Sequence, residues 1–159
     1  MLSGNESAHD YELLANDICT YFGLGCRNVS KIYVPNIQSL VKISDALNNF
    51  NWLLKNSFYA SNLKFQRARL KTIDKHFTDA GNVLFVEKAE LHSPVAIVNY
   101  EIYNDIGEIT NNLQFLNEII QCKVGKDLKK AVPFGSTQKP HLFDYADNID
   151  TMEFLTKLL

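Results

Sequence analysis

Apolar positions in the first half of the chain repeat mainly at helical spacing, with one strand-like interruption. In residues 6–22 the apolar side chains recur every three or four positions, which predicts an amphipathic helix. Residues 31–35 are mostly β-branched or aromatic and stop at a proline, a pattern typical of a short strand. Residues 37–54 and 59–73 return to helical spacing. The predicted order is therefore helix, strand, helix, helix.

The second half of the chain alternates shorter elements. Apolar runs predict strands over residues 82–86, 95–103 and 119–124, and helical spacing predicts helices over 105–118 and 148–159. Strands that alternate with helices of ten or more residues are typical of an α/β fold. We therefore expect one domain, residues 1–159, with an open and mostly parallel sheet flanked by helices.

Composition narrows the classes of function. The net charge of -2 argues against a nucleic-acid partner, and the chain has no apolar run of about 20 residues, so no membrane span is expected. We expect no metal site, because the four histidines lack ligand spacing. Three cysteines, an odd number, favour free thiols in a reducing compartment. No signal peptide is visible, so a cytoplasmic protein is expected.

The most informative segment is residues 21–35, where a predicted helix ends in glycines before a strand. Gly23 and Gly25 favour a tight turn that displays Cys26 at the rim of the sheet, since glycine tolerates positive φ. The amide of Cys26 or Arg27 is then a candidate donor to a developing oxyanion. The alternative is that Cys26 is a small core residue without chemistry.

Residues 23–26, Gly-Leu-Gly-Cys, resemble the Gly-Gln-x-Cys motif of the aldehyde dehydrogenase superfamily, with Leu24 in place of glutamine. The longer string 22–31, Phe-Gly-Leu-Gly-Cys-Arg-Asn-Val-Ser-Lys, is closer to the acyl-CoA reductase (LuxC-like) branch. The resemblance implies an aldehyde-dehydrogenase-like catalytic domain. It also implies that Cys26 is the nucleophile and that Gly25 and Arg27 shape the site.

Two later segments resemble the same superfamily in the same order. Residues 90–95, Glu-Leu-His-Ser-Pro-Val, resemble Glu-x-Phe-Gly-Pro-Val, which implies that the Glu90 carboxylate holds the nicotinamide ribose. His92 and Ser93 replace the usual phenylalanine and glycine. Residues 133–135 resemble a Pro-Phe-Gly-Gly segment, which implies a turn that closes the site; these residues are Pro133, Phe134 and Gly135.

The resemblance implies reduction of an acyl-CoA to a fatty aldehyde. The Cys26 thiolate takes the acyl group from coenzyme A, and a hydride from NADPH reduces the resulting thioester. The thiol must ionise to act, since only the thiolate is nucleophilic. The implied partners are acyl-CoA and a second copy of the chain, because superfamily members dimerise through strands near the C-terminus.

Two parts of the superfamily pattern are missing. The chain has no glycine-rich dinucleotide-binding fingerprint, so we expect the cofactor domain to lie outside it and the isolated chain not to turn over. Met1 occupies the position of the catalytic base, and Glu6 is a poor substitute because a helix N-cap role satisfies it equally well. The alternative function is a non-catalytic module that dimerises or supports a partner.

Overall fold

Four strands form one open sheet in the computed structural model, which describes residues 1–116, 119–126 and 128–158. The strands are β1 (Lys31–Val34), β2 (Phe77–Asp79), β3 (Leu84–Glu87) and β4 (Ile97–Ile102), in the order β1-β4-β3-β2. β4 pairs in parallel with β1 and with β3, and β2 is an antiparallel edge strand. The prediction of an open, mostly parallel α/β sheet is confirmed at this level.

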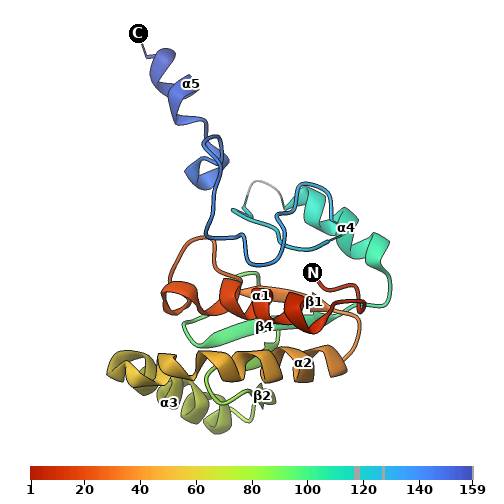
Figure 1. Cartoon of the computed structure of the whole chain (residues 1–159), viewed down its shortest axis with the longest axis vertical. Helices are drawn as coiled ribbons and strands as arrows, with labels where there is room; N and C mark the ends of the chain where they lie inside the picture. Colours follow the sequence, from red (N-terminus) through yellow and green to blue (C-terminus); the bar gives the residue numbers. More distant parts are fainter. Residues whose placement is uncertain (117–118, 127, 159) are drawn as a thin grey trace.

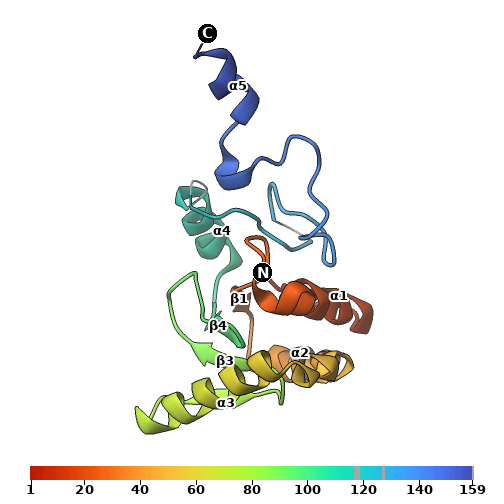
Figure 2. The ribbon, with the colours of Figure 1, turned by 90° about the vertical axis from the view of Figure 1, so that its left-hand side faces the viewer.

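Helices lie on both sides of β1 and β4. In Figures 1 and 2, α2 and α3 lie below these strands and α4 lies above them, while α5 projects away from the body. No helix in the described ranges is long and apolar enough to cross a membrane. The α-helices are α1 (Ala8–Cys19), α2 (Gln38–Leu47), α3 (Ser57–Thr72), α4 (Ile106–Phe115) and α5 (Thr151–Thr156), and the 3-10 helices are η1 (Thr20–Gly23), η2 (Asn48–Lys55) and η3 (Ala146–Asn148).

The two faces of β1 differ in polarity. Ile32 and Val34 are buried in the apolar core that α1 and α2 also line. Lys31 and Tyr33 point to the other face, because side chains alternate along a strand. There the Lys31 ammonium lies 2.6 Å from the carboxylate of Glu101 on β4. The sheet therefore has one apolar face and one partly polar face.

Several predicted boundaries shift in the structure. The helix over 6–22 ends at Cys19, because Tyr21 and Phe22 take left-handed φ values of 53° and 60°. The helix over 37–54 continues from α2 into η2, and β2 was not predicted because only three residues form it. The helices predicted over 105–118 and 148–159 shorten to α4 and α5; residues 117–118 and 159 lie outside the described residues.

The predicted strand over 119–124 is wrong. Within its described residues only Val124 pairs as a strand residue, in an isolated parallel bridge to Val132. Ile119, Ile120 and Val124 instead line a cavity beside β1. An apolar segment that lines a cavity has the same composition as an apolar strand, so composition alone does not distinguish the two.

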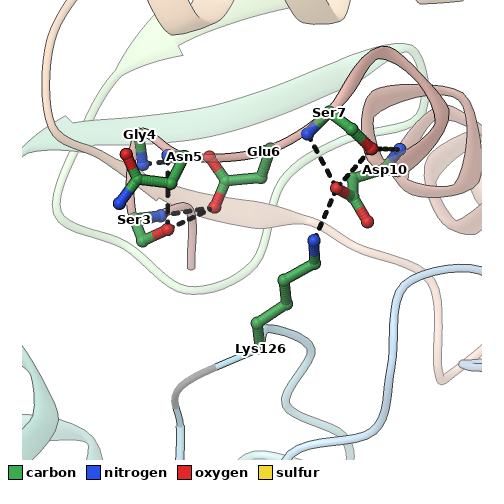
Figure 3. A network of polar contacts seen from close by, with 7 residues as sticks. All are labelled: Ser3, Gly4, Asn5, Glu6, Ser7, Asp10 and Lys126. Atoms are coloured by element: carbon green, nitrogen blue, oxygen red, sulfur yellow. Dashed lines mark hydrogen bonds and ion pairs between the residues drawn. The ribbon is translucent and has the colours of Figure 1, made fainter.

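A capping box starts α1 and also ties it to a distant loop (Figure 3). The Ser7 side chain accepts a hydrogen bond from the Asp10 amide, and the Asp10 carboxylate accepts one from the Ser7 amide at 2.7 Å. The Lys126 ammonium lies 2.7 Å from the same carboxylate. These hydrogen bonds, with that from Lys126 the largest influence, lower the pKa of Asp10 from 3.8 to about 2.

Glu6 shapes the turn that precedes this helix. Its carboxylate accepts hydrogen bonds from the amides of Ser3 and Gly4, at 2.6 Å and 2.9 Å, and from the Ser3 hydroxyl (Figure 3). The N-cap itself is Ser7, not Glu6. A carboxylate with three local donors has a structural role in this turn, and it lies outside the residues that line the cavity beside β1.

We predict that Asp10→Asn lowers the free energy of unfolding by about 1 kcal/mol at neutral pH, through loss of the ionised cap and its ion pair. Because folding lowers the pKa of Asp10, this contribution is present above 3.8 and is lost as the pH falls through about 2. Urea unfolding of both proteins at several pH values measures the difference. The exposed Asp45→Asn variant is the control, and a difference that stays constant on acidification would contradict the prediction.

Candidate functional site

One side chain, Asn28, closes the end of α1 and supports the turn that carries Cys26. Its amide nitrogen donates to the carbonyls of Asp17, Ile18 and Thr20, at 2.7, 3.3 and 3.0 Å. Its amide oxygen accepts from the Gly25 amide at 2.8 Å. The last carbonyls of the helix therefore bond to Asn28, and the negative end of the helix dipole is partly satisfied before it reaches the thiol.

Cys26 lies at the centre of a tight turn. The backbone amide of Asn28 donates to the Gly25 carbonyl at 3.0 Å, which closes a four-residue turn. Cys26 and Arg27 are the two central residues of this turn. Cys26 is exposed, as the sequence predicted. Within the described part of the chain, no acceptor is hydrogen-bonded to the amides of Cys26 or Arg27. Both amides are therefore available to an acceptor from outside the chain.

Glycine is required at the two positions before the thiol, Gly23 and Gly25, for different structural reasons. Gly23 has a φ of 71°, the left-handed conformation that the sequence predicted. Gly25 has no such φ; an added Cβ there would lie 2.7 Å from the Asn28 side-chain oxygen. Close approach of Asn28, rather than backbone freedom, therefore requires glycine directly before Cys26.

The Arg27 side chain turns inward, where only 10% of it is exposed. Its Nε donates to the Thr137 carbonyl at 2.6 Å. Its Nη2 lies 3.5 Å from the Cys122 sulfur and 3.6 Å from the Asp144 carboxylate. Arg27 thus fixes the C-terminal segment against the thiol turn and gives the site a buried positive charge.

A cavity of about 220 Å³ opens beside the turn. Its walls combine apolar side chains from α4 and from loops with cationic or polar groups from β1, the thiol turn and the loop before β4. Residues that represent these walls are Cys26, Lys31, His92, Leu91, Leu113 and Ile120. No group of three His, Cys, Asp or Glu side chains in the described ranges is placed to hold a metal. The cavity therefore has both an apolar and a polar wall.

Glu90 lies outside this cavity although its neighbours Leu91 and His92 line it. Its carboxylate is half exposed and lies 3.2 Å from the Lys88 ammonium. Its own backbone amide and Lys88 lower the pKa of this carboxyl. The structure therefore places Glu90 on the loop next to the site, open to solvent.

Pro133, Phe134 and Gly135 form a turn that packs on α1. Phe134 belongs to the buried core, and Gly135 has a φ of 77°. An added Cβ at Gly135 would lie 2.6 Å from the Leu13 side chain. None of the three residues lines the cavity beside Cys26. Thr137, two residues after Gly135, does line it.

Asp17 holds this turn in place and was missed in the sequence. Its buried carboxylate accepts from the amides of Gly135 and Thr137, at 2.7 and 3.2 Å, and from the Thr137 hydroxyl at 2.8 Å. Burial raises the pKa of Asp17, and the hydrogen bonds oppose this rise. The sequence does contain one sign of this buried carboxylate: Asp17 lies between Leu14 and Ile18 on the apolar face of α1.

We predict that Asp17→Ala destabilises the fold by about 2 kcal/mol, because it leaves two buried amides without an acceptor. The variant should also make residues 133–144 more susceptible to proteolysis, since their anchor to α1 is lost. Urea unfolding and limited proteolysis followed by mass spectrometry measure both effects. Asp45→Ala, an exposed carboxylate on α2, is the control; equal effects of the two variants would contradict the assigned role.

Comparison of the chain with family models, with curated proteins and with solved structures gives no match. The geometry around Cys26 and the short motifs in the sequence therefore remain the only guides to its function.

Proposed function

We propose that the chain is the cysteine-bearing part of an NADPH-dependent acyl-CoA reductase with an aldehyde-dehydrogenase-like fold. The observation that carries this proposal is the exposed Cys26, which lies on a turn with two free amides and borders a cavity with an apolar wall. A thioester substrate needs these same features: a nucleophile, donors for the oxyanion, and space for an acyl chain.

In this proposal the Cys26 thiolate attacks the thioester carbonyl of an acyl-CoA. The carbon–sulfur bond to coenzyme A breaks, the coenzyme leaves as a thiolate, and the acyl group stays on Cys26. The amides of Cys26 and Arg27 donate to the oxygen that becomes negative in the transition state. Apolar side chains of the cavity, among them Leu91 and Leu113, contact the acyl chain.

NADPH, when bound, would supply the hydride that reduces the thioester to an aldehyde. The described residues offer one candidate contact to it, the solvent-open Glu90 carboxylate on the loop beside the cavity. We therefore propose that most of the cofactor site belongs to a separate domain. The three unpaired cysteines support a reducing, cytoplasmic location.

We predict that the reduced chain, mixed with a long-chain acyl-CoA, gains one acyl group on Cys26. Exposure decides the site: Cys19 is buried, which raises the pKa of its thiol to about 12, and burial also raises the pKa of Cys122. Intact-mass and peptide mass spectrometry measure the adduct. Cys26→Ser should reduce labelling at least about tenfold.

Cys19→Ser and Cys122→Ser are the matched controls and should keep the adduct. Acylation at Cys19 or Cys122, or full labelling of Cys26→Ser, would contradict the proposal. No adduct on any cysteine in the folded chain would contradict it as well.

A specific observation also favours the second function, a module that dimerises. Helix α5 projects away from the body (Figures 1 and 2), and the segment from residue 142 to its end exposes many apolar side chains. They include Leu142, Phe143, Ile149, Met152, Phe154 and Leu155. Apolar side chains on a projecting helix gain stability when a partner covers them.

We predict that the chain is a homodimer and that Phe154→Glu shifts it to the monomer, because a charge would then face the apolar contact. Light scattering measures the mass. The control is Phe65→Glu, an equally exposed phenylalanine on α3. A monomeric wild-type chain, or a Phe154→Glu variant that remains a dimer, would contradict this assembly.

A further inference from the structure

The cavity beside Cys26 contains a second thiol. Cys26 and Cys122 both line it. They are far apart in the sequence: Arg27, the residue after Cys26, precedes Cys122 by 95 positions. Cys122 lies in the irregular segment that follows α4 and is half buried. Cys19, in contrast, belongs to the apolar core. The fold therefore brings two of the three thiols to one cavity.

Arg27 connects the two thiols. Its backbone follows Cys26 directly, and its Nη2 lies 3.5 Å from the Cys122 sulfur. A guanidinium at this distance stabilises a thiolate. Burial nevertheless raises the pKa of Cys122, and Arg27 opposes that rise. Burial therefore favours the neutral thiol of Cys122, and the adjacent Arg27 guanidinium can stabilise its thiolate once that forms.

We infer that Cys26 and Cys122 are a redox pair that forms a reversible disulfide on exposure to a peroxide. A disulfide requires Cα atoms about 4.4–6.8 Å apart. Neither thiol belongs to an α-helix or to a strand of the sheet, so the approach of the two sulfurs across the cavity involves the tight turn and the segment after α4. The cavity itself supplies the space for this movement.

The chemistry proceeds in two balanced steps. The exposed Cys26 thiolate attacks one oxygen of the peroxide; the O–O bond breaks, Cys26 becomes a sulfenic acid, and hydroxide (or an alkoxide) leaves. The Cys122 thiolate, beside Arg27, then attacks the Cys26 sulfur. The S–S bond forms, the S–O bond breaks, and the oxygen leaves as water after it takes up the proton that Cys122 released.

The consequence for activity rests on the proposed function, in which Cys26 accepts the acyl group. A disulfide would remove the nucleophile and fill part of the cavity, so acyl transfer would stop under oxidation. It would also protect Cys26 from irreversible oxidation to the sulfinic acid, and a dithiol would restore it.

The test treats the reduced full chain with hydrogen peroxide, blocks free thiols with N-ethylmaleimide and maps the peptides without reduction. We expect a linked peptide pair that contains Cys26 and Cys122 and that dithiothreitol separates. In Cys122→Ser the same dose should convert Cys26 to sulfinic acid, and the thiol recovered by dithiothreitol should fall roughly tenfold. Cys19→Ser should behave as the wild type.

The linked peptide in the wild-type chain does not depend on the folding of any variant. Cys26 found oxidised to sulfinic acid, or joined to Cys26 of a second chain, would overturn the pair; so would a Cys122→Ser variant with unchanged recovery. Peptide mapping needs no acyl-CoA, so a failure of acyl transfer and a failure of this inference are distinguishable.

Discussion

The buried Asp17 is the constraint on which the rest of the site depends. Its carboxylate accepts from Gly135 and Thr137, more than a hundred residues along the chain. Its backbone carbonyl accepts from the Asn28 side chain and from the Val29 amide. One residue at the end of α1 therefore fixes both the turn that carries the thiol and the segment that packs against that turn.

Burial of this carboxylate is unfavourable by itself, and the raised pKa of Asp17 reflects the desolvation. The arrangement persists because every partner is a fixed donor of the C-terminal segment. Thr137 in turn gives its carbonyl to Arg27 at 2.6 Å. The buried negative charge and the buried positive charge thus act on the same short segment from its two sides. Movement of this segment would disturb both charges, which makes the site one cooperative unit.

Local signals in the sequence predicted the helices, three of the four strands and the exposed turn at Cys26. They failed where tertiary contacts decide the conformation. Tyr21 and Phe22 continue the helical pattern but adopt left-handed φ values, and the apolar residues 119–124 line a cavity instead of extending the sheet. The contacts of Asp17 and Arg27 join segments over a hundred residues apart, so no local pattern contains them. The carboxylate on an apolar helix face was the only local sign of a buried partner.

The three cysteines of the chain lie in different environments, which give their thiols different reactivity. Cys19, in the core, has no solvent access, and burial raises the pKa of its thiol to about 12. Cys122 is half buried, where desolvation and the Arg27 guanidinium have opposite effects on the same sulfur. Cys26 is exposed beside free amides. Because a thiolate reacts only where a substrate can approach it, exposure ranks the three thiols by accessibility: Cys26 first, then Cys122, then Cys19.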